Sequence, residues 1–159
     1  MAEVGVIESR GAAPDDARFG VIASKFNGEI VDRLVDGCVQ TLRDQGVSAR
    51  HITIVKVPGA FEIPFAARRM AMSGNYDVLI ALGAVIRGDT AHFDHVAGQC
   101  ARGICEVSAD LDLPIAFGVL TTDTEEQAAA RAGGSEGNKG SEAALAAIEM
   151  INVIRELAK

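Results

Sequence analysis

The sequence predicts a single α/β domain, folded as a three-layer α/β/α sandwich around a central four-stranded parallel sheet. Apolar runs of strand length alternate with longer segments of helical periodicity along most of the chain. The strand-like runs are almost continuously apolar, as expected for strands that helices cover on both faces. With 159 residues, 48% of them hydrophobic, the chain can bury one core of ordinary size.

The elements of the sheet and its two covering layers can be assigned in order. Strands are expected over 19–23, 52–57, 77–82 and 114–120. Helices are expected over 28–45, 61–73, 92–111, 124–132 and 139–157. Gly46 and Gly74 occupy helix-ending positions, and Thr124 with Gln127 matches a capping box. Short connections between these elements favour right-handed crossovers. The last two helices are rich in alanine, which allows close contacts within the domain or with another subunit.

Residues 1–18 are predicted to form an arm and a loop ahead of the domain of residues 19–159. The segment 9–17 has the composition of a loop, so the apolar stretch VGVI at 4–7 is separated from the first strand. This stretch is either a detached edge strand or an arm.

The composition excludes several classes of protein and partner. The formal net charge of −7 argues against a nucleic-acid or anionic-membrane partner, because both need a basic surface. No apolar run is long enough to span a membrane, and the N-terminus lacks the features of a signal peptide. Cys38, Cys100 and Cys105 are expected to be buried free thiols. Together these features predict a cytoplasmic protein.

Two aromatic residues directly follow predicted strands. Phe26 lies in SKFNGE after the first strand, and Phe61 lies beside Glu62 in PGAFEIP after the second. The carboxyl ends of parallel strands form the usual ligand site of such sheets. In a chain with six Phe, one Tyr and no Trp, this placement indicates a stacking site. The alternative is that both rings fold back onto the core.

The loop after the third strand has the features of a phosphate site. Gly88, Asp89 and Thr90 lead into a predicted helix, whose free backbone N–H groups can bind phosphate. Thr90 is also a candidate helix N-cap. Asp89 would have to contact a phosphate through its backbone, since its side chain repels an anion.

His92 is the best candidate for moving protons. Histidine side chains ordinarily have a pKa of about 6.5, which suits proton transfer near neutral pH. His92 also lies off the apolar stripe of its predicted helix. His95 and His51 are interpreted as structural. An HxxH metal pair with Asp89 or Asp94 lacks further ligands, so no metal site is expected.

The segment RAGGSEGNKG at 131–140 is predicted to be a flexible turn with two cations. It is no Walker A loop, because Asn138 interrupts its glycine–lysine spacing and a helix precedes it. No dinucleotide-binding GxGxxG follows the first strand either. Arg131 can pair with a phosphate through its planar donors, although Arg131 and Lys139 can equally be solvated cations at helix ends.

Five motifs in order resemble lumazine synthase, the family of the penultimate enzyme of riboflavin biosynthesis. The resemblance runs from about residue 19 to the C-terminus. The motifs are FN (26–27), VPGAFEIP (57–64), GAVIRGDTAHFDHV (83–96), FGVLTT (117–122), and RAG with GNKG (131–133 and 137–140).

The resemblance implies a flavodoxin-like sandwich and a transferase that uses neither metal nor organic cofactor. The expected substrates are 5-amino-6-(ribitylamino)uracil and 3,4-dihydroxy-2-butanone 4-phosphate. Their condensation gives 6,7-dimethyl-8-ribityllumazine and releases phosphate and water.

The resemblance also implies roles for particular residues. Phe26 stacks on the pyrimidine, His92 transfers protons, and Arg131 pairs with the phosphate. The residues that hold the ribityl chain and the ring are Ala60, Phe61, Glu62, Ala84, Val85 and Ile86.

Further residues are implied near the phosphate and at the subunit boundary. Asp89 and Thr90 meet the phosphorylated substrate, mainly through backbone groups. Phe117 resembles the aromatic residue that a neighbouring subunit contributes. Lys139 and Glu142 match nearby charged positions.

Members of this family form pentamers, and some assemble these into hollow icosahedral shells. A homo-oligomer is therefore expected, with the N-terminal arm paired to a neighbour's sheet. The turn GGSEG at 133–137 differs from the lysine-containing turn usual in shell formers, which leaves the pentamer or a pentamer-based shell open. Two rival interpretations remain: a flavin- or pterin-binding module without catalysis, and a shell protein with a vestigial site.

Overall fold

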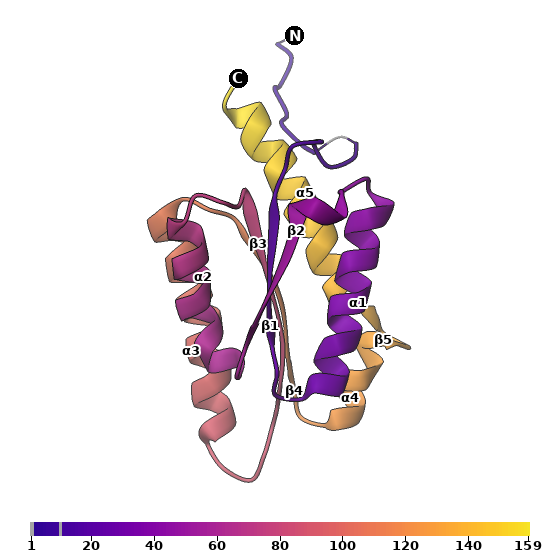
Figure 1. Cartoon of the computed structure of the whole chain (residues 1–159), viewed down its shortest axis with the longest axis vertical. Coiled ribbons are helices and arrows are strands. Elements are labelled where there is room, and N and C mark those ends of the chain that lie inside the picture. Colours follow the sequence, from indigo (N-terminus) through magenta and orange to yellow (C-terminus); the bar gives the residue numbers. More distant parts are fainter. Residues whose placement is uncertain (1, 10) are drawn as a thin grey trace.

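A computed structural model describes residues 2–9 and 11–159 and has three layers (Figure 1). The central layer is a parallel sheet in the order β2-β1-β3-β4. Its strands are β1 (Phe19–Ser24), β2 (Ile52–Val57), β3 (Val78–Ile86) and β4 (Ile115–Thr122). The predicted α/β sandwich of flavodoxin-like type, with four parallel strands, is confirmed.

Helices cover both faces of the sheet (Figure 1). One face carries α2 (Ile63–Met72) and α3 (His92–Leu111). The other face carries α1 (Gly28–Asp44), α4 (Glu125–Ala130) and α5 (Lys139–Leu157). The 3₁₀ turns are η1 (Ala49–His51) and η2 (Ala60–Glu62), and a small hairpin joins β5 (Ala132–Gly134) to β6 (Gly137–Asn138).

The sheet separates two hydrophobic clusters. Successive side chains of a strand point to opposite faces, so Val21 and Ala23 pack toward α1 and α5. Ile22, between them, packs toward α2 and α3. Every residue of β1 is buried, which explains why its sequence is continuously apolar.

The predicted helix ends agree with the structure at three places. Thr124 accepts a hydrogen bond from the backbone of Gln127, and the Gln127 side chain returns one to complete the capping box. Gly46 and Gly74 have φ angles of +93° and +73°, the left-handed region that favours glycine after a helix. The N-cap prediction for Thr90 is wrong by one residue, because Ala91 directly precedes α3.

Several boundaries differ from the sequence prediction. β3 continues to Ile86 because its pairing with β4 extends to Ile86 and Thr122, so GAVI at 83–86 is strand rather than loop. Residues 61–62 belong to η2, and α2 begins only at Ile63. The turn predicted at 131–140 contains the β5–β6 hairpin, and the preceding helix α4 ends at Ala130 rather than at residue 132.

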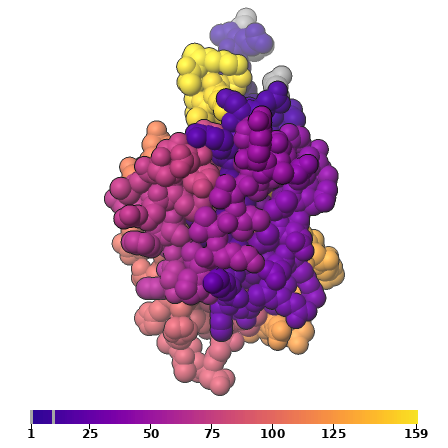
Figure 2. All heavy atoms as spheres, viewed as in Figure 1, coloured from indigo at the N-terminus to yellow at the C-terminus, as the bar shows by residue number. Residues whose placement is uncertain are grey.

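The N-terminal arm forms no helix or strand over residues 2–9. Val4, Val6 and Ile7 are 83%, 70% and 53% exposed, so the apolar stretch is not an edge strand of its own sheet. Figure 2 shows the arm and the end of α5 projecting at the same end of the molecule. Met1 and Arg10, which fall within the predicted arm and loop, lie outside the described residues.

The cysteines are free thiols in two different environments. Cys38 and Cys100 are buried as predicted, and burial raises the pKa of Cys100 to about 11. Cys105 is exposed in the single chain, contrary to the prediction, because it lies on the outer side of α3. Within the described part of the chain, no helix combines the length and apolar character needed to cross a membrane.

The contact between α1 and α5 predicts a sharp stability effect at Gly140. A Cβ at this position would collide with the backbone carbonyl of Leu34, which cannot move aside without shifting α1. We expect Gly140→Ala to lower the free energy of unfolding by about 1–3 kcal/mol. Gly28 lies in the first turn of α1, and a Cβ there meets nothing within 4 Å.

Gly28→Ala is therefore the matched control, expected to change stability by less than about 0.5 kcal/mol. Denaturant unfolding at one fixed protein concentration measures both variants. Equal stabilities for Gly140→Ala and wild type would contradict the close α1–α5 contact.

Candidate active site

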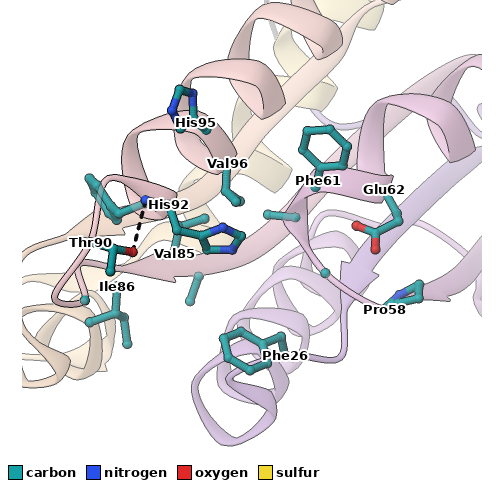
Figure 3. A pocket seen from close by; sticks show the side chains of 15 residues that line it. Phe26, Pro58, Phe61, Glu62, Val85, Ile86, Thr90, His92, His95 and Val96 are labelled. Atoms are coloured by element: carbon teal, nitrogen blue, oxygen red, sulfur yellow. Dashed lines mark hydrogen bonds between the residues drawn. The ribbon is translucent and has the colours of Figure 1, made fainter.

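A cavity of about 780 Å³ opens at the carboxyl ends of β1, β2 and β3, beside the start of α3 (Figure 3). This volume lies in the range typical of small-molecule sites. The described residues that line it are Phe26, Pro58, Gly59, Ala60, Phe61, Glu62, Ala84, Val85, Ile86, Gly88, Thr90, His92, Phe93, His95 and Val96.

Phe26 is held at the cavity by its backbone while its ring stays free. The Phe26 N–H donates to the carbonyl of Pro58 at 3.0 Å, which joins the ends of β1 and β2. The next residue, Asn27, adopts a left-handed conformation, and its side-chain amide donates to the carbonyl of Ala84 at 2.8 Å. Phe26 is 71% exposed, so it does not fold back onto the core.

Phe61 provides the second aromatic wall, from the turn η2. Phe61 is 59% exposed, and in Figure 3 its ring lies across the cavity from Phe26. The Glu62 N–H donates to the carbonyl of Gly59 at 3.2 Å, which closes the turn. The Glu62 carboxylate, beside Phe61, is the acidic group in the cavity lining among the described residues. Two exposed rings facing one space suit a flat, partly polar ligand.

The floor of the cavity is small and apolar. Ala60, Ala84 and Val85 are 6%, 3% and 8% exposed, so their side chains form a packed surface beneath the rings. Ile86 extends this surface toward the loop that follows β3. A ligand that covers this floor displaces water from it. Polar interactions at the rim of the cavity are then stronger, because the surroundings have a lower dielectric constant than water.

His92 begins α3 and points its ring into the cavity (Figure 3). Its backbone N–H donates to the Thr90 hydroxyl at 3.3 Å, which orders the turn into the helix. Gly88 and Thr90 line the same part of the cavity. The positive end of a 20-residue helix therefore lies beside the imidazole, a suitable environment for an anion.

Four residues predicted for the site do not line this cavity. Asp89 is exposed in the loop between two lining residues. Phe117 lies on the edge strand β4, opposite Ala81, and is 39% exposed. Ala81 lies three positions before Ala84 in β3, which is about 10 Å along a strand. Phe117 is therefore about that far along the sheet from the cavity floor.

Arg131 and Lys139 lie with α4, the small hairpin and α5. Arg131 is exposed at the end of α4, where its guanidinium donates to the carbonyl of Gln127 at 3.0 Å. The Lys139 N–H donates to the carbonyl of Arg131 at 2.8 Å, which joins the backbones of the two residues. These helices cover the face of the sheet opposite α3, so the chain does not bring Arg131 beside its own His92.

The sequence interpretation missed several lining residues. His95, interpreted as structural, lies one turn beyond His92 on α3, and Phe93 and Val96 also line the cavity. The spacing 92, 95, 96 is one face of a helix, so helical periodicity could have identified them once His92 was chosen. Phe93 is stacked under Arg87, whose guanidinium carbon lies 4.5 Å from the ring centroid.

The described lining of the cavity provides no positively charged lysine or arginine side chain to pair with a phosphorylated ligand. A phosphate in a partly buried site is usually paired with a guanidinium or ammonium group. In the described ranges, no group of three or more His, Cys, Asp or Glu side chains could hold a metal ion.

A comparison with protein-family models agrees with the motifs and with the site. Residues 16–155 match the model described as 6,7-dimethyl-8-ribityllumazine synthase, which covers all the strands and nearly all of the helical layers. Since the match spans most of the 159 residues, the chain belongs to the 6,7-dimethyl-8-ribityllumazine synthase family, a family of transferases in riboflavin biosynthesis.

Proposed function

We propose that this protein condenses 5-amino-6-(ribitylamino)uracil with 3,4-dihydroxy-2-butanone 4-phosphate to form 6,7-dimethyl-8-ribityllumazine, releasing phosphate and water. The observation that carries the proposal is that Phe26, Phe61 and His92, from three separate segments, face one cavity. The family match supplies the chemistry that such a cavity would perform.

In this proposal the pyrimidine lies between the two aromatic side chains. Phe26 stacks on the ring, while Phe61, Glu62 and the small floor residues hold the ring and the ribityl chain. Glu62 and the backbone groups of η2 are the polar groups available to its hydroxyls and ring nitrogens. The apolar floor of Ala60, Ala84, Val85 and Ile86 excludes water from the reacting atoms.

The phosphorylated substrate lies at the start of α3. Its phosphate is placed beside Gly88 and Thr90, where the helix N-terminus favours an anion. Asp89 contributes through its backbone. His92 then lies beside both substrates and moves protons during imine formation, phosphate elimination and ring closure. Such transfer contributes about 10²- to 10⁴-fold to a rate.

A second copy of the chain completes the site. The cavity lining has no cation of its own, whereas Arg131 and Lys139 are exposed on the opposite face of the sheet. In a ring of identical subunits, one copy's opposite face can meet the next copy's cavity. Arg131 then pairs with the phosphate, Lys139 and Glu142 lie nearby, and Phe117 adds an aromatic contact.

This arrangement makes the protein a homo-oligomer, which we take to be a pentamer or a shell built from pentamers. The exposed apolar residues at 4–7 support it, because an unpaired arm can add a strand to a neighbour's sheet.

The cytoplasmic location stays a prediction from the free thiols and the composition.

Incubation of the purified protein with both substrates tests the proposed function directly. We expect fluorescence from the lumazine product together with release of inorganic phosphate. Tight binding of the pyrimidine with no product would favour a flavin- or pterin-binding module instead. Assembly into shells with neither binding nor product would favour a vestigial site.

Replacement of His92 tests its proton-transfer role. We expect His92→Ala to lower turnover at least about tenfold, because His92, of the two described histidines that line the cavity, is the one whose ring points between the aromatic walls. Binding of a pyrimidine analogue should be retained, since the phenylalanines remain. His51→Ala is the matched control, because His51 precedes β2 at the other end of the sheet. Unchanged turnover in His92→Ala would remove His92 from the chemistry.

Mixed oligomers test whether neighbouring copies share the site. We expect His92→Ala and Arg131→Ala to be poorly active when each is expressed alone. Co-expressed in equal amounts, they should form intact sites at about a quarter of the subunit boundaries, each with one variant's His92 and the other's Arg131. The measurement is turnover of the mixed oligomers, purified through a different tag on each variant. Activity no higher than the average of the two variants would place Arg131 outside a shared site.

A further inference from the structure

Arg87 connects the end of β3 to the end of β4, just before the loop that leads to His92. Its backbone N–H donates to the carbonyl of Thr122 at 2.8 Å. Its side-chain Nε donates to Oδ1 of Asp123, also at 2.8 Å. The backbone of Arg87 is therefore tied to the end of β4, and its guanidinium to the residue that follows β4. The hydrogen bond to Asp123 raises the pKa of Arg87.

The anchored guanidinium also contacts the first turn of α3. Its central carbon lies 4.5 Å from the centroid of the Phe93 ring, within the range of a cation–π contact. Its Nη1 lies 3.6 Å from Oδ1 of Asp94. Phe93 and Asp94 directly follow His92 in the chain. One planar group therefore joins β3, β4 and the helix turn that carries the imidazole, which a lysine could not do with one ammonium.

Folding stability does not account for this arrangement. The side chains of Arg87, Asp94 and Asp123 are 46%, 61% and 67% exposed. Exposed ion pairs contribute about 0–1 kcal/mol, so these contacts add little to the free energy of unfolding. The contacts instead connect the end of β4 to the first turn of α3, on either side of residues 87–91, a segment without helix or strand that leads to His92.

We propose that Arg87 is a positioning residue that holds His92 at the cavity by fixing Phe93 and Asp94. This inference rests on the proposed function, in which His92 transfers protons between the two substrates. Arg87 is not among the described residues lining the cavity, so it acts through its neighbours. A shift of the imidazole by about 1 Å is enough to cost a large factor in rate.

Substitution of Arg87 separates positioning from binding. We expect Arg87→Ala to lower kcat about tenfold, while the affinity for a pyrimidine analogue changes less than about twofold. Arg87→Lys keeps a charge for Asp123 but loses the simultaneous contacts to Phe93 and Asp94, so its kcat should be intermediate. Arg33→Ala is the matched control, because Arg33 is 51% exposed and paired with Glu29 on α1. It should keep wild-type kcat.

The same substitution in a His92→Ala background tests the route of the effect. If Arg87 acts through His92, Arg87→Ala causes no further loss of kcat in that background. An equal loss in both backgrounds, or unchanged kcat in Arg87→Ala, would overturn the inference while leaving the proposed function intact. Wild-type protein without turnover would overturn the proposed function, and this inference with it.

Discussion

The parallel pairing of β1 with β2 and β3 is the constraint on which the site depends. Because these three strands run in the same direction, the segments after them reach the same edge of the sheet. Residues distant in sequence, such as Phe26, Phe61 and His92, therefore share one cavity. Hydrogen bonds from the backbone of Phe26 and the side chain of Asn27 then fix the first of these segments to its neighbours.

The same sheet separates two kinds of functional surface. The face covered by α2 and α3, together with the carboxyl ends of β1, β2 and β3, supplies aromatic walls, an apolar floor and an imidazole. No lysine or arginine is among the described lining residues. The other face carries Arg131 and Lys139 in exposed positions, and the edge strand β4 carries the exposed ring of Phe117. Such a division makes a single chain chemically incomplete. In the proposed function, a neighbouring copy of the chain supplies the missing cation.

Much of the fold was predictable, because continuous apolar runs and helical periodicity depend on local sequence. The placement of Phe26, Phe61 and His92 at one edge followed from strand direction alone. The extension of β3 to Ile86 depends on pairing with β4, a contact between distant segments that periodicity does not contain. The β5–β6 hairpin and the contacts of Arg87 are likewise set by tertiary packing. Periodicity likewise does not show that Arg131 lies with the helices on the face of the sheet opposite α3.

The most direct measurement is a crystal structure of the assembled protein with a pyrimidine analogue and inorganic phosphate bound. The pyrimidine should stack on Phe26, with the phosphate beside Thr90 and in contact with an Arg131 guanidinium from an adjacent copy. A phosphate held by Arg131 of the same chain, or a cavity that faces solvent in every copy, would contradict the shared site.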